Sequence, residues 1–352
     1  MTSLPQAGLF DHLDRQDRSL TRTYEERLQL IEAADRAGFR AYHLAEHHFT
    51  PLGMAPSPSV FLAAVAQRTV DLRIGSLVHV LPLYHPVRLA EEICMLDHLS
   101  GGRVEFGVGA GTSPHELRLM GADPETAREQ FREAFEVLLL ALRNDRLTYQ
   151  GRRYRFDDVE LPLRPVQRPN PPAWYPCTNP ERLPWIATAG FHTVVAGPDV
   201  LAAAMARTFL EVVAQVPAGH RVNATGEQPL AGLLRTVFVG RTDAEARATA
   251  GRAFAEHARS FATLWARYGG ATSTLTEDID VAIRAGEAIV GAPATVRERV
   301  AAALAVTGCN YFVMPLTFGN LPAREAARSL QAFVEEVAPG VVALGEGDDS
   351  TD

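Results

Sequence analysis

The chain contains no lysine, only three cysteines among 352 residues, and no long run of apolar residues. Its positive charge is therefore all arginine, and 34 basic against 42 acidic residues give a net charge of −8. An acidic chain without a basic run is not expected to bind nucleic acid. Because it has no stretch of about 18 apolar residues, we also expect no membrane span.

The cysteines, Cys94, Cys177 and Cys309, are odd in number, far apart and without the spacing of metal ligands. Charged residues crowd positions 11–18, where a signal peptide would have an apolar core. The expectation that follows is a reduced, cytoplasmic protein. Nothing near Cys177 in the sequence would activate it as a nucleophile.

Short apolar runs rich in β-formers alternate with helical patterns along the chain. We expect strands at 7–10, 41–44, 72–80, 104–108, 173–175, 193–196, 233–239 and 311–315. A helical pattern follows each of them, and eight strand–helix units are typical of a (β/α)8 TIM barrel. An open doubly wound sheet is less favoured, because no Gly-rich phosphate turn follows the first strand. In a barrel the chemistry lies at the C-terminal ends of the strands.

We expect one barrel domain over 1–344 and a disordered acidic tail over 345–352. Two segments interrupt the alternation: 147–172, which indicates a short hairpin and a proline-rich connection, and the polar stretch 269–285. Both are candidates to be insertions that cover the C-terminal face and shape a substrate pocket, with 269–285 as a lid. Side chains that could line an apolar pocket, although core packing suits most of them better, are Leu81, Leu83, Phe106, Trp174 and Phe318.

Glu46, His47, His48 and Phe49 directly follow the second expected strand. Neighbouring side chains on an extended segment point in opposite directions, so one histidine can face the barrel mouth while the other packs sideways. Histidine is suited to proton transfer near neutral pH. From position alone, two ordinary surface histidines explain the pattern equally well.

His79 and His85 flank the end of the third expected strand and, with His47, suggest a histidine cluster. Barrel hydrolases bind metals through His-x-His at a strand end, and that motif is absent here. We therefore expect no metal. His85 stands directly before Pro86, a position that also suits a helix cap.

Polar or glycine-rich turns follow two further strands. The run 106–113 has three glycines in five residues, which suit either close approach to a flat ligand or a structural turn. It lacks the Gly-Lys-Ser/Thr of a Walker loop. Thr178 and Asn179 stand at an expected helix N-terminus, where an anion site and plain N-capping are both typical.

These motifs together resemble the bacterial luciferase-like flavin monooxygenases. The resemblance is carried by 45–50, 85–88, 96–103 and 106–109, and it returns at 291–293. It implies a barrel that forms a homodimer and binds a flavin at its C-terminal mouth. It further implies reduced FMN, delivered by a separate reductase, and O2, which form a flavin C4a-peroxide that oxidises a small organic substrate.

By position, the resemblance makes His47 the catalytic acid/base group near the flavin C4a and places Glu46 near the isoalloxazine. Leu77 and Val78 fall where relatives have a non-prolyl cis peptide against the flavin ring. His85 matches a position near the subunit interface, where its role is structural. The other residues expected to bind the flavin or its phosphate are Gly109, Gly111, Thr112, Ser113, Thr178 and Asn179.

The chain departs from the family pattern at Ala110, where many relatives have an arginine that pairs with the FMN phosphate. Losing such a charge-assisted contact weakens binding by about 1.5–3 kcal/mol if nothing replaces it. We expect Arg182, beside the 178–179 loop, to replace it. Weak binding of a shuttled reduced flavin is the alternative explanation.

Two other functions compete with the FMN-dependent monooxygenase. Some relatives use a deazaflavin coenzyme for hydride transfer without O2, and some are non-catalytic flavin-binding partner subunits that tend to lose the histidine. The presence of His47 argues against the second, whereas Ala110 argues slightly for it.

Overall fold

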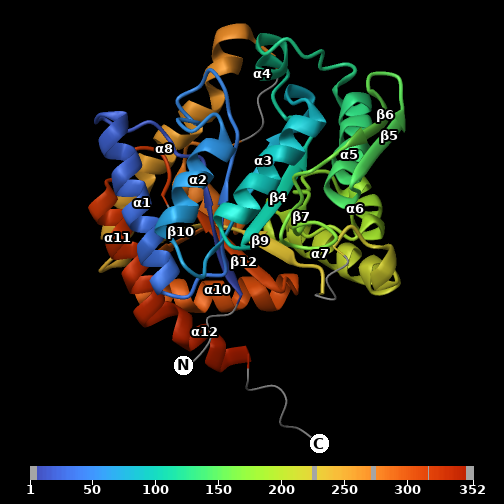
Figure 1. The fold of residues 1–352 in the computed structure, drawn as a ribbon. Coiled ribbons are helices and arrows are strands. Elements are labelled where there is room, and N and C mark those ends of the chain that lie inside the picture. The colour runs from blue at the N-terminus through green and yellow to red at the C-terminus, as the bar shows by residue number, and fades with distance from the viewer. Residues whose placement is uncertain (1–5, 224–227, 271–274, 316, 346–352) are drawn as a thin grey trace, which may run out of the picture.

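Eight parallel strands form the centre of the molecule, which a computed structural model describes over residues 6–223, 228–270, 275–315 and 317–345 (Figure 1). The strands lie in the order β7-β4-β3-β2-β1-β12-β9-β8. Isolated bridges Trp174↔His192 and Cys177↔Val195 join the two ends of this order and close the barrel. Its strands are β1 (Ala7–Asp11), β2 (Ala41–Leu44), β3 (Arg73–Val80), β4 (Val104–Gly109), β7 (Ala173–Trp174), β8 (Thr193–Val195), β9 (Ala231–Leu234) and β12 (Tyr311–Pro315). The predicted (β/α)8 barrel is confirmed.

Helices surround the barrel, and their apolar faces cover its outer surface. They are α1 (Leu20–Arg36), α2 (Pro58–Arg68), α3 (Pro86–Leu99), α4 (Pro114–Leu119), α5 (Ala127–Arg143), α6 (Leu183–Ala189), α7 (Asp199–Ala214), α8 (Asp243–Tyr268), α9 (Ile279–Ala285), α10 (Pro293–Thr307), α11 (Ala323–Ala332) and α12 (Ala338–Gly345). None of the described helices is long and apolar enough to cross a membrane.

The expected seventh strand, 233–239, is wrong as a single element. The chain forms two strands there, β9 in the barrel and β10 (Thr236–Val239), which pairs with β11 (Ala288–Gly291) outside it. The change occurs at Arg235, whose backbone N–H still donates to Val313 of β12, while its side chain turns away to an ion pair with Asp199. A single apolar run thus serves two sheets, because the hydrogen-bonding partner changes in the middle of it.

Three short helices were not expected. Helix α4 has six residues, too few for a periodic pattern. Helix α9 lies inside the stretch 269–285 that we expected to be polar and irregular, of which 271–274 lie outside the described residues. Helix α12 extends the fold to residue 345, and the tail 346–352 lies outside the described residues.

The segment 147–172 contains the predicted hairpin, β5 (Arg146–Gln150) with β6 (Arg155–Glu160). The hairpin packs along α5, where Glu133 accepts hydrogen bonds from the backbone of Arg153 and Tyr154. Its aromatic residues meet His85 at the start of α3. The hairpin therefore lies at the side of the barrel and does not cover its mouth, contrary to the expectation.

A buried carboxylate fills the barrel interior on the side away from the mouth. Glu105 of β4 accepts a hydrogen bond of 2.6 Å from Trp174 and forms ion pairs with Arg40 and Arg73. Burial opposes ionisation, but the two guanidinium groups hold the pKa of Glu105 well below its usual range. This end of the barrel is thus filled by a paired polar core.

The cover of the mouth comes from α4 and the last turns of α8, which meet at one end of the barrel (Figure 1). His115 of α4 packs edge-on against Trp265 and bonds to the carbonyl of Gly269. Thr50, in the loop after β2, donates to the carbonyl of Ser260 in α8. Segments far apart in the chain are thus joined over the C-terminal ends of the strands.

Candidate active site

His47 lies at the mouth of the barrel, directly after β2, and a carboxylate holds its ring. Nδ1 of His47 lies 3.1 Å from Oε1 of Glu116 in α4, and Oε2 of the same carboxylate accepts from the backbone N–H of His48. Glu116 is 7% exposed, so this pair is shielded from bulk water. The arrangement fixes one ring nitrogen and leaves Nε2 of His47 outside the hydrogen bonds formed by described residues.

Glu46 points the other way and ties two strand ends together. One oxygen of its carboxylate lies 2.9 Å from Nε2 of His48, and the other accepts from Val80 N–H and the Tyr84 hydroxyl, each at 3.0 Å. The opposite directions of Glu46 and His48 on one side and His47 on the other confirm the alternation predicted for this segment. With three partners already bound, the Glu46 carboxylate supports the site from behind.

A tight turn presses against His47. A Cβ on Gly53 would lie 2.7 Å from the His47 Cβ and 2.8 Å from its carbonyl oxygen, so only glycine fits. Phe49, in the same turn, adopts a left-handed conformation with φ of 59° and leaves 58% of its surface exposed. Such a conformation is costly for a bulky residue, and it persists only where the surroundings enforce it.

The end of β3 lies close to β4. The peptide bond between Leu77 and Val78 is cis, the conformation that the resemblance predicts. A Cβ on Gly107 would lie 2.4 Å from the Ser76 carbonyl oxygen, and one on Gly109 would lie 2.8 Å from the Val78 side chain. Close contact between two strands therefore explains these glycines without a ligand.

Beyond β4, Gly111 has a φ of +87°, which favours glycine. Ser113 caps α4 by accepting from the backbone N–H of Glu116, whereas Thr112 is exposed and Ala110 is half-buried. The capping role of Ser113 accounts for one of the residues that we expected at the flavin.

The loop after β7 carries a set of unused hydrogen-bond donors. Asn179 accepts from Glu181 N–H through Oδ1, as N-capping predicts, but no hydrogen bond of the described residues uses its NH2 group or the exposed Thr178 hydroxyl. Burial raises the pKa of the Tyr175 hydroxyl, and the nearby charges of Arg182 and, more weakly, Arg128 oppose that rise. Arg128, in the first turn of α5, is a positive charge near this loop that sequence reasoning missed.

The histidine cluster suggested by His47, His79 and His85 does not form. His79 is buried between the hydroxyls of Ser76 and Ser59, at 2.6 and 3.3 Å, and burial lowers its pKa to about 3. The ring of His85 packs edge-on against the aromatic residues of β6 and the turn before it, which suits a structural role.

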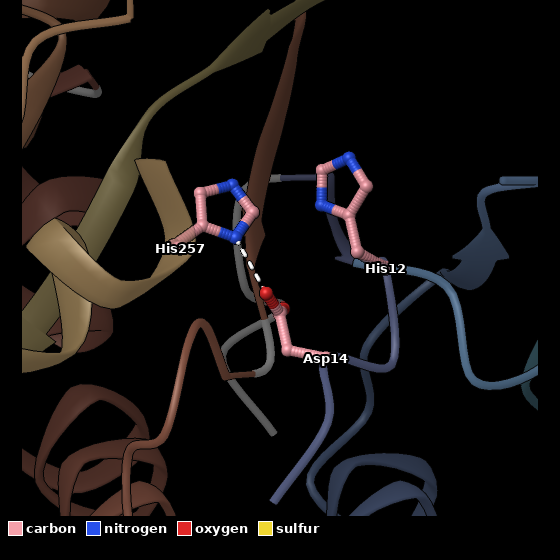
Figure 2. A group of neighbouring side chains, drawn as sticks. All are labelled: His12, Asp14 and His257. Atoms are coloured by element: carbon pink, nitrogen blue, oxygen red, sulfur yellow. Dashed lines mark hydrogen bonds and ion pairs between the residues drawn. The ribbon is translucent and has the colours of Figure 1, made fainter. Parts of the chain in front are cut away.

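A different group of histidines meets at the mouth, and sequence reasoning missed it. The His12 ring lies 5.4 Å from the His47 ring and 4.9 Å from the His257 ring, between centroids. Figure 2 shows Nδ1 of His257 facing Asp14, with 2.9 Å between the bonded atoms. His12, Asp14 and His257 form the one group of three metal-ligating side chains among the described residues with one ligand atom each within 4.8 Å.

The three histidines differ in charge preference. Burial, with the neighbouring His257 and His47, lowers the pKa of His12 well below its usual value, so His12 is neutral near pH 7. Burial also opposes charging of His257, but Asp14 outweighs burial and raises the pKa of that imidazole. The neutral ring of His12 therefore lies between the His47–Glu116 pair and the His257–Asp14 pair.

An apolar pocket of about 300 Å³ opens beside this group. It lies at the C-terminal ends of β1, β8, β9 and β12, under α8. Of the side chains that we expected in such a pocket, Phe318 lines it, whereas Phe106, Trp174 and Leu81 are fully buried in the core. Leu83 borders a different surface hollow near α5.

The chain is similar in sequence to a known family and to several known proteins. A family model described as luciferase-like monooxygenase matches residues 6–310. An uncharacterized protein of Sinorhizobium fredii is 42% identical over 316 residues, 90% of this chain and 91% of that protein. Limonene 1,2-monooxygenase of Rhodococcus erythropolis is 37% identical over 138 residues, 39% of this chain and 36% of that protein. The oxygenase component of a flavin-dependent trigonelline monooxygenase from Acinetobacter baylyi is 32% identical over 178 residues, 49% of each chain.

Several solved structures share the fold. Monooxygenase RslO1 from Streptomyces bottropensis superposes with a TM-score of 0.83 at 24% identity, over 95% of this chain and 99% of that one. The oxygenating constituent of 3,6-diketocamphane monooxygenase from Pseudomonas putida, solved with FMN, gives 0.75 at 21%, over 96% and 98%. A coenzyme F420 dependent reductase from Methanopyrus kandleri gives 0.68 at 17%, over 96% and 99%. At these identities the likeness shows the barrel fold alone.

We expect Asp14→Asn to destabilise the protein more at low pH than at high pH. A group with a raised folded-state pKa, such as His257, stabilises the fold below its unfolded pKa, and the effect is lost as the pH rises through the folded-state value. Urea unfolding at about pH 5.5 and about pH 8.5 measures the difference in unfolding free energy. The exposed Asp145→Asn serves as the control, and equal losses at both pH values for Asp14→Asn would contradict the prediction.

Proposed function

The chain belongs to the luciferase-like monooxygenase family, and from this premise we propose that it uses reduced FMN and O2 to oxidise a small organic molecule. The observation that carries the proposal is the order of features around one half of the mouth. His47 follows β2, the 77–78 segment lies in the second half of β3, and the donors of the 178–182 loop follow β7. In the barrel β2 and β3 are neighbours, and β4 lies between β3 and β7.

The donors of the 178–182 loop fit a phosphate group. Three donors of this loop have no carboxylate partner among the described residues: the Thr178 hydroxyl, the NH2 group of Asn179 and the guanidinium of Arg182. Charge-assisted bonds to arginine are the strong contacts in phosphate recognition. Arg128 adds a second positive charge on the neighbouring helix. Two arginines, Arg182 and Arg128, are therefore candidates to replace the phosphate contact that is missing at Ala110.

The remaining residues proposed to hold the flavin lie on the strands and loops between the 178–182 loop and His47. These are Glu46, Leu77, Val78, Gly109, Gly111, Thr112 and Ser113, of which Glu46 and Ser113 act through the backbone and ring that they hold. When bound, the flavin supplies the redox chemistry with O2. We assign His47 to proton transfer because Glu116 fixes one nitrogen of its ring and the other nitrogen has no partner among the described residues.

Exclusion of water is the task proposed for α4 and the end of α8. His115, Trp265 and Phe261 pack together above the site, and Thr50 ties the loop after β2 to α8. Dry surroundings strengthen hydrogen bonds and prevent loss of oxidising equivalents to water. We thus propose α4 and the end of α8 for the covering role that the sequence suggested for 147–172 and 269–285.

We also propose a separate reductase partner, a homodimer and a cytoplasmic location. The name of the trigonelline relative, an oxygenase component, supports a separate reductase for this chain. Val60 of α2 and Met95 of α3, exposed by 73% and 55% on two helices in contact, are candidate contact residues of the proposed homodimer. All three cysteines are free and buried, which agrees with the proposed cytoplasmic location.

The experiment that tests the proposal is an anaerobic titration of the purified chain with FMN, reduced FMN and the oxidised deazaflavin coenzyme, followed by fluorescence. We expect reduced FMN to bind most tightly, because the proposed reaction with O2 starts from the reduced flavin. A preference for the deazaflavin coenzyme would contradict the proposal and indicate hydride transfer without O2. Binding of none of the three would favour a non-catalytic subunit.

We expect Arg182→Ala to weaken FMN binding by about 1.5–3 kcal/mol and leave riboflavin binding almost unchanged. Riboflavin lacks the phosphate, so the difference isolates the guanidinium–phosphate contact. Arg128→Ala is predicted to have a smaller effect of the same kind, because its charge acts more weakly near the loop. Arg241→Ala, an exposed arginine paired with Glu245, is the control. Equal losses for FMN and riboflavin would refute the assignment.

We expect His47→Ala to lower O2-dependent turnover by about 10²- to 10⁴-fold, the usual contribution of a general acid or base. Turnover is measured by mass spectrometry with reduced FMN and whichever member of a ketone and aldehyde panel the parent chain oxidises. His98→Ala, exposed at the end of α3, controls for loss of a histidine. Undiminished turnover of His47→Ala would show that the acid/base role is wrong.

A further inference from the structure

The mouth of the barrel has a second half that the proposed flavin site does not use. The residues assigned to flavin lie in or directly after the C-terminal halves of β2, β3, β4 and β7, whereas the 300 Å³ pocket lies at the ends of β1, β8, β9 and β12. Six apolar side chains dominate its wall: Phe10, Leu234, Phe254, Phe261, Pro315 and Phe318. The pocket is at the small end of the range for ligand sites, and its wall is typical of them.

A hydrogen-bonded pair projects into this apolar wall. His257 lines the pocket, and its Nδ1 donates to Oδ1 of Asp14 at 2.9 Å. In Figure 2 the opposite nitrogen, Nε2, points away from Asp14. No hydrogen bond of the described residues uses Nε2. The pair therefore presents one oriented, unpaired polar atom to whatever fills the pocket.

The loop that holds Asp14 is firmly anchored. Asp14 is 2% exposed, and the next backbone N–H, of Arg15, donates to the Pro51 carbonyl at 2.8 Å. Gln16 donates to the Gly319 carbonyl at 2.6 Å. The loop after β1 is thereby joined to the loops after β2 and β12, so His257 is held in one orientation, as a precise contact to a ligand requires.

We propose that this pocket binds the organic substrate and that Nε2 of His257, oriented by Asp14, donates a hydrogen bond to a carbonyl oxygen of that substrate. The inference rests on the proposed function and names its substrate class: a small, mainly apolar ketone or aldehyde. The His12 ring lies 5.4 Å from the His47 ring and 4.9 Å from the His257 ring. A carbonyl group bound at His257 would therefore lie close to the half of the mouth assigned to flavin.

Two observations favour a neutral carbonyl compound over other small molecules. Glu287 lines the pocket, and Asp14 offsets the positive charge that His257 can take up, so a carboxylate ligand would gain no net attraction there. A pure hydrocarbon would cover Nε2 without offering an acceptor. A buried donor left without a partner is penalised, and this selects against an analogue that lacks the oxygen.

The test compares two probes of the same shape, acetophenone and ethylbenzene, by calorimetric titration of the full chain. We expect the parent chain to bind acetophenone more tightly, and His257→Phe to weaken acetophenone roughly 10- to 100-fold while leaving ethylbenzene as tight or tighter. Asp14→Asn is expected to give an intermediate loss, because Asp14 acts by positioning His257. His220→Phe, at an exposed histidine on the surface, is the matched control.

A direct readout keeps the inference testable if His257→Phe does not fold. The carbonyl stretch of bound acetophenone, measured by infrared spectroscopy in the parent chain, is expected at lower wavenumber than in an apolar solvent. It is expected to return toward that solvent value in His257→Leu, whose side chain has no donor, and in Asp14→Asn. An unshifted stretch, equal affinity for the two probes, or binding of neither overturns the proposal.

A metal ion is the remaining alternative for this group of side chains. Stoichiometric Zn²⁺ or Fe²⁺ that is lost in His12→Ala would overturn the hydrogen-bond assignment. Titration of the same variants with FMN separates the two proposals. Selectivity for acetophenone without FMN binding would refute only the proposed function, and FMN binding without that selectivity would refute only this inference.

Discussion

The buried carboxylate of Glu46 is the contact on which the mouth of the barrel depends. It accepts from the backbone of Val80 at the end of β3, from Tyr84, and pairs with His48 after β2. Because Glu46 and His48 share one side of an extended segment, His47 is directed to the other. A polar side chain that is only 5% exposed is tolerated when such hydrogen-bond partners satisfy it. The position of His47 thus follows from a contact made on the opposite side of the chain.

The same principle operates three times at this end of the barrel. Each of three histidines, His47, His48 and His257, has one ring nitrogen fixed by a carboxylate. His48 is used in holding the loop, whereas His47 and His257 keep their second nitrogen free of described partners. The neutral ring of His12 lies between the rings of His47 and His257. In the proposed assignment, the cofactor and the substrate each face one of these oriented imidazoles, His47 and His257.

The arrangement also explains how a short cover serves a wide opening. Helix α4 supplies Glu116 to His47 and His115 to the end of α8. The six-residue helix that covers the mouth is therefore also the one that orients His47, the residue we propose for proton transfer.

Local pattern was sufficient for much of the fold. Seven of the eight barrel strands appear close to their predicted bounds, because a buried parallel strand is a short apolar run and a surface helix has a period of its own. The exception, 233–239, is one apolar run shared by two sheets, and no local signal marks a change of partner. The opposite directions of His47 and His48 were also predictable, since they depend only on the period of an extended chain.

The partners of those side chains were not predictable. Glu116 lies 69 residues from His47, and His257 lies 243 residues from Asp14. Barrel closure brings such residues together, and their spacing along the chain carries no trace of it. The sequence by itself determined the barrel, its catalytic end and the histidine that faces it. Only the tertiary structure decided which carboxylate orients each imidazole and which half of the mouth is apolar, because both depend on loops from distant strands meeting at one rim.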